Sequence, residues 1–281
     1  MTQTGTLYVV ATPIGNLQDV TLRAIDTLRT VLHVAAEDTR RTRALLAHLG
    51  IQGRQLHSLH AHSTEPEVER LALLLQRGED IALATDAGTP LVSDPGSALV
   101  RAAIRGGARV VPIPGPSSVL AALVVSGMAT DGAFRFVGFV PRAGPERRDA
   151  ILRISATPEP VVLFESPLRV AETLHDLADA TPERGACVAR ELTKVHEEAT
   201  RGTLADLATD TREWRGEVAI VLGAYRPESR QEEIDDAAID ARIESELSRG
   251  VHANAIAERI AAWSGRPRRE LYARVVAMKE R

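Results

Sequence analysis

Short apolar runs alternate with segments of helical periodicity through the first 120 residues of the chain. In the helical segments, apolar side chains recur every three or four positions, which is the spacing of one buried helix face. This regular alternation predicts an α/β domain with a largely parallel sheet and right-handed crossovers. The expected strands are 7–11, 32–36, 55–59, 81–85 and 109–113, and the expected helices are 20–30, 40–49, 66–76 and 96–105.

A second α/β unit follows, in which strands and helices alternate less regularly, so a mixed sheet is expected. Its strands are expected near 134–140, 161–165, 186–190 and 217–222. An acidic, breaker-rich stretch then predicts a linker, and a segment with helical spacing ends the chain after one break at Gly265-Arg266-Pro267. The expected organisation is an N-terminal domain at 1–120, a second domain at 121–225, a linker at 226–240 and a helical extension at 241–281.

Three loops rich in glycine and proline follow strands of the first domain. They are TPIGN at 12–16, LATDAGTPLVSDPG at 83–96 and PIPGPSS at 112–118. Proline fixes φ and glycine allows positive φ, so such loops hold backbone N–H and C=O groups close to a ligand. Because loops after parallel strands meet at one sheet edge, they predict a single ligand crevice. Neither a P-loop pattern nor Gly-x-Gly-x-x-Gly occurs, which argues against a phosphate cradle or an ordinary dinucleotide site.

The composition places the chain in a broad class. Of its 281 residues 44% are hydrophobic, which is enough for the cores of two modest domains. The one cysteine, Cys187, has no cysteine partner for a disulfide or a zinc site, so we expect a core position in a reducing compartment. No run approaches ~18 apolar residues, and no basic-then-apolar leader opens the chain. We therefore expect a cytoplasmic protein without a membrane segment.

The formal net charge of −4 argues against a general attraction to nucleic acid, but the distribution of charge matters more than the total. All but two of the 34 basic residues are arginines, the exceptions being Lys194 and Lys279, and arginine suits bidentate contacts to phosphate. Each arginine cluster has two readings, an RNA contact or a solvated helix face. The acidic total favours a structured RNA over bare RNA as a target. The clusters are Arg40, Arg41 and Arg43; Arg142, Arg147 and Arg148; and Arg266, Arg268 and Arg269.

Several long motifs occur in order along the chain. The first four are VVATPIGNLQDVTLRA at 9–24, AAEDTRRTRALL at 35–46, LATDAGTPLVSDPG at 83–96 and VPIPGPSS at 111–118. The next four are FVGFVPR at 136–142, FESPLRV at 164–170, ARELTKVHEE at 189–198 and GEVAIVLG at 216–223. In these motifs the chain resembles the tetrapyrrole-methylase superfamily, and within it the ribosomal RNA small subunit methyltransferase I branch.

The resemblance implies an activity and a cofactor. It implies a homodimer that uses S-adenosyl-L-methionine to methylate the ribose 2′-hydroxyl of a cytidine in 16S rRNA, within the small ribosomal subunit. The first loop lacks the Gly-Pro-Gly pattern of the porphyrin-methylating branches, which argues against a tetrapyrrole substrate. The cofactor is expected in a cleft between the two α/β domains. By the matched motifs, its binding residues are Pro13, Gly88, Thr89, Pro90, Ser117, Ser118, Phe164, Glu165 and Leu192, with the strand at 216–222.

Transfer of a methyl group from a sulfonium to an oxygen is an in-line displacement, in which placement supplies much of the catalysis and a general base adds to it. No metal is expected; His57, His60 and His62 are the nearest ligand-like group and favour polar surface or an RNA contact. The catalytic candidates are Asp38, Glu191 and Lys194. Each candidate also has a structural reading: Asp38 as a helix N-cap, Glu191 and Lys194 as a salt bridge. Asp86 and Asp94 are interpreted as turn residues that bond within their own loop.

Arg40 and Arg43 follow a strand of the first domain, and Arg142, Arg147 and Arg148 follow the first strand of the second. We expect these five arginines to bind RNA from opposite rims of the cleft. The basic helical tail predicts either an RNA-binding helix pair or a pair docked on the main body. Two alternatives to the RNA methyltransferase stay open: a related enzyme that methylates a protein or a small molecule, and a non-catalytic module that binds the ribosome.

Overall fold

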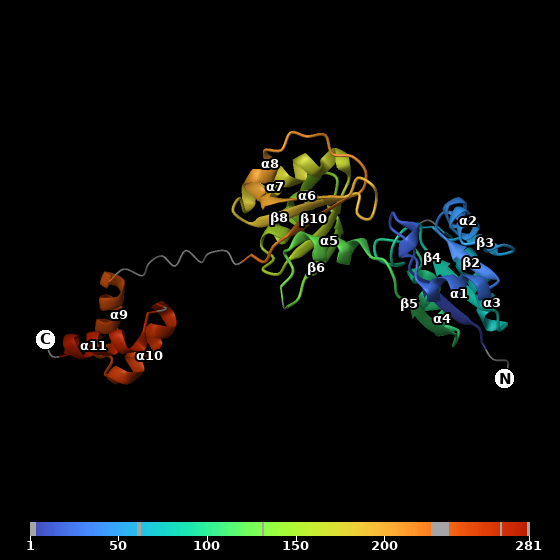
Figure 1. Ribbon diagram of the computed structural model, residues 1–281. Coiled ribbons are helices and arrows are strands. Elements are labelled where there is room, and N and C mark those ends of the chain that lie inside the picture. The colour runs from blue at the N-terminus through green and yellow to red at the C-terminus, as the bar shows by residue number, and fades with distance from the viewer. Residues whose placement is uncertain (1–3, 61–62, 131, 226–235, 265, 280–281) are drawn as a thin grey trace. The chain divides into compact units, whose positions relative to one another are not determined.

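The computed structural model describes residues 4–60, 63–130, 132–225, 236–264 and 266–279 (Figure 1). The chain divides into two compact units, residues 1–225 and 226–281, which are described separately. The first unit contains two five-stranded sheets, and the second contains helices. None of the described helices is long and apolar enough to cross a membrane.

The first sheet is parallel throughout, as the alternating pattern predicts. Its order is β3-β2-β4-β1-β5. Alternate residues of β4 show why it is covered on both faces: Ile81 and Leu83 pack with α3 and α4, whereas Ala82 and Ala84 pack with α1 and α2. The elements are β1 (Thr6–Val10), α1 (Leu22–Thr30), β2 (His33–Ala36), α2 (Thr39–His48), β3 (Gln55–Ser58), α3 (Glu65–Gln76), β4 (Ile81–Ala84), α4 (Ser97–Arg105) and β5 (Arg109–Ile113), with a 3-10 turn, η1, at Leu17–Asp19.

The second sheet is mixed, as predicted, with the order β6-β7-β10-β8-β9. β6 and β7 run parallel, and the remaining neighbours run antiparallel. One face packs on α5, and the opposite face on α6, α7 and α8. The elements are α5 (Ser118–Ser126), β6 (Arg135–Phe139), α6 (Gly144–Ser155), β7 (Val161–Glu165), η2 (Pro167–Arg169), α7 (Val170–Ala180), β8 (Gly185–Arg190), β9 (Glu198–Thr203), α8 (Leu204–Ala208) and β10 (Val218–Leu222).

Two details of this region differ from the sequence-based expectation. The domain boundary placed at residue 120 falls inside α5, whose buried residues pack on the second sheet, so the boundary precedes Ser118. The edge strand β9 was not predicted, because its sequence EATRGT has no apolar alternation and its residues are at most half-buried. β9 is held by its backbone register on β8.

The second unit has a core of its own. Its helices are α9 (Asp236–Ser248), α10 (Ala253–Ser264) and α11 (Arg268–Lys279). They bury apolar side chains from all three helices, including Ile239, Ile256 and Leu271. The linker expected at 226–240 is therefore wrong over its last five residues, which begin α9 because Ile239 enters this core. Residues 226–235 lie outside the described part of the chain.

Candidate functional site

Hydrogen bonds join the three glycine- and proline-rich loops at the carboxyl edge of the first sheet. Thr12 and Gly88 exchange two backbone bonds, with N···O distances of 2.8 and 2.9 Å. The hydroxyl of Thr89 donates to the carbonyl of Pro116 at 3.0 Å. Gly88 has a φ of +83°, which disfavours any other residue, and an added Cβ would lie 3.3 Å from Cγ2 of Ile14. These hydrogen bonds fix the positions of the three loops relative to one another.

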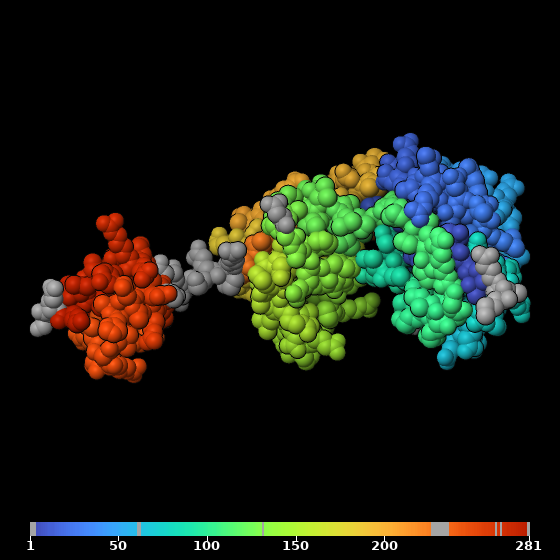
Figure 2. Space-filling model, turned by 90° about the horizontal axis from the view of Figure 1, so that it is seen from below, coloured from blue at the N-terminus to red at the C-terminus, as the bar shows by residue number. Residues whose placement is uncertain are grey.

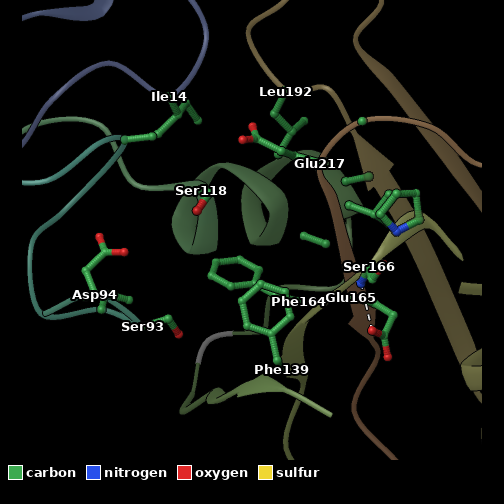
Figure 3. A pocket seen from close by; sticks show the side chains of 17 residues that line it. Ile14, Ser93, Asp94, Ser118, Phe139, Phe164, Glu165, Ser166, Leu192 and Glu217 are labelled. Atoms are coloured by element: carbon green, nitrogen blue, oxygen red, sulfur yellow. Dashed lines mark hydrogen bonds between the residues drawn. The ribbon is translucent and has the colours of Figure 1, made fainter. Parts of the chain in front are cut away.

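A cavity of about 450 Å³ opens beside these loops, between the first sheet's edge and the second sheet (Figure 3). One side carries polar groups from the first-sheet loops and α5, and the other side is aromatic and aliphatic. In Figure 3, Asp94 and Ser93 lie on the opposite side of the phenylalanine pair from Glu165 and Ser166. The lining residues are Ile14, Ala87, Val92, Ser93, Asp94, Ser118, Phe139, Phe164, Glu165, Ser166, Pro167, Ala189, Leu192 and 216–219.

The cavity's aromatic side is built on β6 and β7. Phe164 packs against Phe139 with ring centroids 5.6 Å apart and against Phe136 at 4.9 Å. Phe139 is 58% exposed, which is unusual for a large apolar side chain with an aromatic partner. Such a surface suits a flat heterocycle, because stacking buries apolar area on both partners.

The predicted cofactor residues divide into two groups. Ser118, Phe164, Glu165 and Leu192 line the cavity. The carboxylate of Glu165 is fully buried and is bound by Arg169, Thr173 and the backbone N–H of Ser166, so those oxygens are already occupied. The other predicted cofactor residues shape the loops rather than the lining: Pro13, Gly88, Thr89, Pro90 and Ser117, of which Ser117 caps α5.

The loop after β8 joins the second sheet to the first loop of the chain. An added Cβ on Gly15 would lie 2.5 Å from Cγ of Lys194, so only glycine fits beneath that side chain. In Figure 2 the surface of the N-terminal residues, in dark blue, adjoins the gold surface of residues close to 200 within the first unit. Glu191 and Thr193 adopt positive φ values of 51° and 66°. Strained non-glycine backbone of this kind concentrates at ligand sites.

Glu191 and Lys194, two of the catalytic candidates, bind each other. Nζ of Lys194 lies 2.8 Å from Oε1 of Glu191 and 3.0 Å from Oε2 of Glu217. The hydrogen bond from Lys194 lowers the pKa of Glu191. Burial opposes the charge on Lys194, but its two carboxylate partners raise its pKa overall. Both groups therefore stay charged and paired, and their geometry holds the loop that carries Leu192.

Asp38, the third catalytic candidate, is a helix cap. Its Oδ1 accepts from the backbone N–H of Arg40 at 2.8 Å, and its Oδ2 lies 2.8 Å from the guanidinium of Arg40. The hydrogen bond from the Arg40 side chain lowers the pKa of Asp38 to about 2. A carboxylate with so low a pKa is a weak general base near neutral pH.

A second set of carboxylate side chains lies around the buried hydroxyl of Thr85. Oγ1 of Thr85 donates to Oδ2 of Asp94 at 2.6 Å and lies 3.2 Å from Oε2 of Glu37. Asp86 accepts from the backbone N–H of Asp38 at 3.0 Å. Burial, followed by the charges of Asp94 and Asp86, raises the pKa of Glu37. Burial also raises the pKa of Asp94.

Only Asp94 of this group lines the cavity. The sequence assigned it to its own loop, and its bond to Thr85 agrees with that assignment, but its position beside the cavity was not foreseen. The one sequence signal was its place in the SDPG turn of the longest loop. Asp86 bonds outside its loop, to the start of α2.

The arginines predicted to bind RNA also divide. Arg40, Arg43, Arg142 and Arg148 are exposed. Arg147 is not, because only 6% of its side chain is exposed and it lies 2.7 Å from Asp176 and 3.6 Å from Glu172. It also donates to the buried hydroxyl of Thr173. The expectation that Arg147 binds RNA is wrong on these grounds: the helix periodicity turns its side chain toward α7.

Among the described residues, no group of three or more His, Cys, Asp or Glu side chains is placed to hold a metal ion. Nε2 of His57 lies 3.0 Å from Nδ1 of the buried His33, whose other ring nitrogen lies 2.5 Å from Glu79. His57 on β3 therefore belongs to a line of three contacting side chains, with His33 on β2 and Glu79. His62 lies outside the described residues.

Comparisons with known proteins agree with this geometry. The family model for Tetrapyrrole (Corrin/Porphyrin) Methylases matches residues 6–208. The chain is 44% identical over 277 residues to a ribosomal RNA small subunit methyltransferase I of Xylella fastidiosa, covering 97% of this chain and 99% of the relative. It is 40% identical over 272 residues to a protein of the same name from Halalkalibacterium halodurans, covering 95% and 93%.

A solved structure shares the fold. It is a uroporphyrin-III C-methyl transferase from Thermus thermophilus, complexed with S-adenosyl homocysteine, which aligns with a TM-score of 0.56 and 19% identity. The alignment covers 78% of this chain and 97% of that one. A diphthine synthase aligns with a TM-score of 0.58 and 17% identity, covering 78% of this chain and 90% of that one. The TM-scores show a common fold, and identities this low show nothing beyond the fold.

Proposed function

The chain belongs to the tetrapyrrole (corrin/porphyrin) methylase family, and from that premise we propose that it methylates RNA of the small ribosomal subunit with S-adenosyl-L-methionine. The acceptor we propose is the ribose 2′-hydroxyl of a cytidine in 16S rRNA. The observation that supports RNA methylation most is the near full-length similarity to relatives named ribosomal RNA small subunit methyltransferase I, together with the two-sided cavity at the joined loops.

The cavity residues fit the proposed cofactor. Phe139, Phe164 and Leu192 offer an apolar surface for the adenine ring, and Ser93 and Ser118 offer hydroxyls for polar groups. When bound, S-adenosyl-L-methionine supplies a methyl group activated by a sulfonium. The protein's part is to hold donor and acceptor in line, which can lower the barrier by roughly 7–11 kcal/mol.

RNA binding is assigned to exposed arginines on both α/β domains. Arg40 and Arg43 lie on α2, which follows a first-sheet strand, and Arg142 and Arg148 lie beyond β6. Arg40 is 86% exposed despite its pairing with Asp38, so a phosphate can reach its guanidinium. Arginines in such positions contribute sequence-independent affinity, and the shape of the RNA supplies the rest.

The proposal extends to assembly and compartment. Large apolar side chains outside the cavity are exposed on α5, with Leu120 at 52% and Val124 at 78%, which supports a homodimer. The single buried cysteine supports a reducing, cytoplasmic setting. The C-terminal helices bury apolar side chains in a core of their own, so they do not need to dock on another surface to fold. This supports an RNA-binding helical module over a docked helix pair.

Transfer of tritiated methyl groups tests the function. The acceptors are naked 16S rRNA, assembled small subunits and total protein, each incubated with the chain and labelled S-adenosyl-L-methionine. Label in 16S rRNA, recovered as an alkali-resistant dinucleotide after hydrolysis, is the expected result. Label in protein would support the alternative methyltransferase instead. Cofactor and subunit binding without any transfer would support the non-catalytic module.

A further inference from the structure

Two apolar side chains at one edge of the second sheet are open to solvent. Among the described residues, Val195 at 96% and Leu168 at 91% are the most exposed of the large apolar side chains. Single exposed apolar residues are ordinary on a protein surface, but these two lie beside the same cavity. Leu168 directly follows the lining residue Pro167, and Val195 comes three residues after Leu192, which also lines the cavity (Figure 3).

The fold places both side chains at the same sheet edge. β7 and β8 each run antiparallel to β10, which lies between them, so β7 and β8 run in the same direction and end at the same edge. The turn that carries Leu168 follows β7, and the turn that carries Val195 follows β8. Two strand spacings separate these strand ends by about 10 Å. Three base steps of a nucleic acid strand, at about 3.4 Å each, cover the same distance.

The turn of Leu168 is held by the residue that follows it. The guanidinium of Arg169 lies 2.5 Å from the buried carboxylate of Glu165 and donates to the carbonyl of Val140 at 3.1 Å. The backbone beside Leu168 is therefore fixed while its side chain stays in solvent. Because the charge of Arg169 is already paired, this turn offers a ligand apolar surface rather than a free cation.

The turn of Val195 is closed by backbone hydrogen bonds. The N–H of Lys194 donates to the carbonyl of Glu191 at 3.0 Å, and the N–H of Glu197 donates to the carbonyl of Lys194 at 3.1 Å. The ammonium of Lys194 is paired with Glu191 and Glu217. Val195 is thus a second fixed apolar side chain next to a cation that is already neutralised.

These features suit nucleobases better than a protein or a phosphate. A stable protein interface buries about 800 Å² on each partner, far more than two separate side chains provide. A phosphate needs a free cation, and the cations of both turns are paired. A base presents a flat apolar face, and exposed leucine-like side chains insert between base steps as wedges. The acceptor ribose has to enter a cavity of about 450 Å³, so its nucleotide must leave the stack of its neighbours.

Resting on the proposed function, we propose that Leu168 and Val195 bind the two bases that flank the acceptor nucleotide. Each side chain covers the base face that is uncovered when the acceptor nucleotide turns into the cavity. The RNA recognised at this edge is a single-stranded or opened segment, because a paired helix does not present its base faces. The exposed arginines contact phosphates, and the two apolar side chains position the acceptor.

The test is single-turnover methylation by the full chain at increasing concentrations of assembled small subunits. Leu168→Ser and Val195→Ser should each raise the half-saturating concentration by about tenfold, as expected for the loss of one buried aliphatic contact. The salt dependence of binding should not change, because no phosphate contact is lost. Cofactor affinity, measured by calorimetry, and the melting temperature should also stay at the wild-type values, because both side chains are exposed.

Matched variants separate a base contact from a general surface effect. Ile104, near the end of α4, is 61% exposed, and α4 leads away from the loop edge of the first sheet. Ile104→Ser should therefore leave the half-saturating concentration unchanged. Leu168→Met and Val195→Ile should keep it within about threefold, because they retain the apolar surface. Leu168→Phe should match or lower it, because an aromatic ring stacks on any base.

Four results would overturn the inference. One is an unchanged half-saturating concentration in both serine variants, and another is a reduced salt slope, which would indicate phosphate contacts. Loss of a dimer in sedimentation of the serine variants would instead make this edge an interface between copies. A Leu168→Phe variant as weak as Leu168→Ser would indicate packing against a protein. If the wild-type chain binds the cofactor but methylates no RNA, the proposed function itself fails, whereas an active wild-type chain with unaffected serine variants refutes this inference alone.

Discussion

Gly216 offers a quantitative test of how the site is held together. Its φ is +80°, and an added Cβ would lie 2.1 Å from Oε1 of Glu191. That oxygen accepts from Lys194 at 2.8 Å and from the backbone N–H of Glu217 at 2.9 Å. Gly216→Ala must therefore adopt a left-handed backbone with a side chain and also displace the Glu191 carboxylate.

The magnitude follows from these two costs. A left-handed backbone costs an L-residue about 1–2 kcal/mol. Loss of the Glu191 hydrogen bonds, which are partly exposed, adds about 1–2 kcal/mol. We expect Gly216→Ala to lower the free energy of unfolding by about 2–4 kcal/mol. Because the displaced loop carries Leu192, we also expect cofactor binding to weaken by about tenfold, or 1.4 kcal/mol.

A double-mutant cycle separates the two costs. Gly127 has a φ of +71° with nothing within 4 Å of an added Cβ, so Gly127→Ala should show the backbone cost alone. Glu191→Ala removes the obstacle, so the double variant with Gly216→Ala should lose the hydrogen bonds once rather than twice. Urea unfolding should then give a coupling of about 1–2 kcal/mol between positions 191 and 216. Additive losses, or equal losses in Gly216→Ala and Gly127→Ala, would refute the steric reasoning.

Three further results are expected. Burial raises the pKa of Asp94 above its unfolded value, so the stability that its protonated form contributes is lost as the pH rises through the folded pKa. Asp94→Asn should therefore melt at or above the wild-type temperature at pH 8. Near pH 4, where the wild-type carboxyl is protonated, this advantage should disappear. Burial, then His33, lowers the pKa of His57, so stability should fall below about pH 6.5 as the unfolded chain takes up the proton, and His57→Gln should show a shallower fall in melting temperature. Arg40→Ala and Arg43→Ala should each reduce the salt slope of RNA binding by about 0.7–0.9 and keep the cofactor affinity. Arg147→Ala should instead lower the free energy of unfolding by about 1.5–3 kcal/mol, because it removes the charge-assisted hydrogen bonds to Asp176, a carboxylate that solvent still reaches.

The pattern of strands and loops in the sequence predicts much of this protein's organisation. The apolar run at 81–84 is buried on both faces, and a short run of this kind between turn residues is typical of a central strand between two helical layers. The loop that follows it was identifiable because glycine and proline restrict the backbone in ways that depend on the residue alone. The strand β9 was not identifiable, because its pairing rests on backbone hydrogen bonds to β8 and its side chains carry no periodic signal.

By itself, the sequence determined the two sheets, their parallel and mixed characters, and the loops that meet at one edge, because hydrophobic period and loop chemistry are local properties. Only the tertiary structure decided which charged side chains face the cavity. Asp38 and Asp94 both follow strands of the first sheet, yet one is bound by Arg40 and the other lines the cavity. Arg147 and Arg148 are neighbours, yet the first is buried against α7 and the second is exposed. Such differences depend on partners distant in the sequence, and a charge's role is set by those partners.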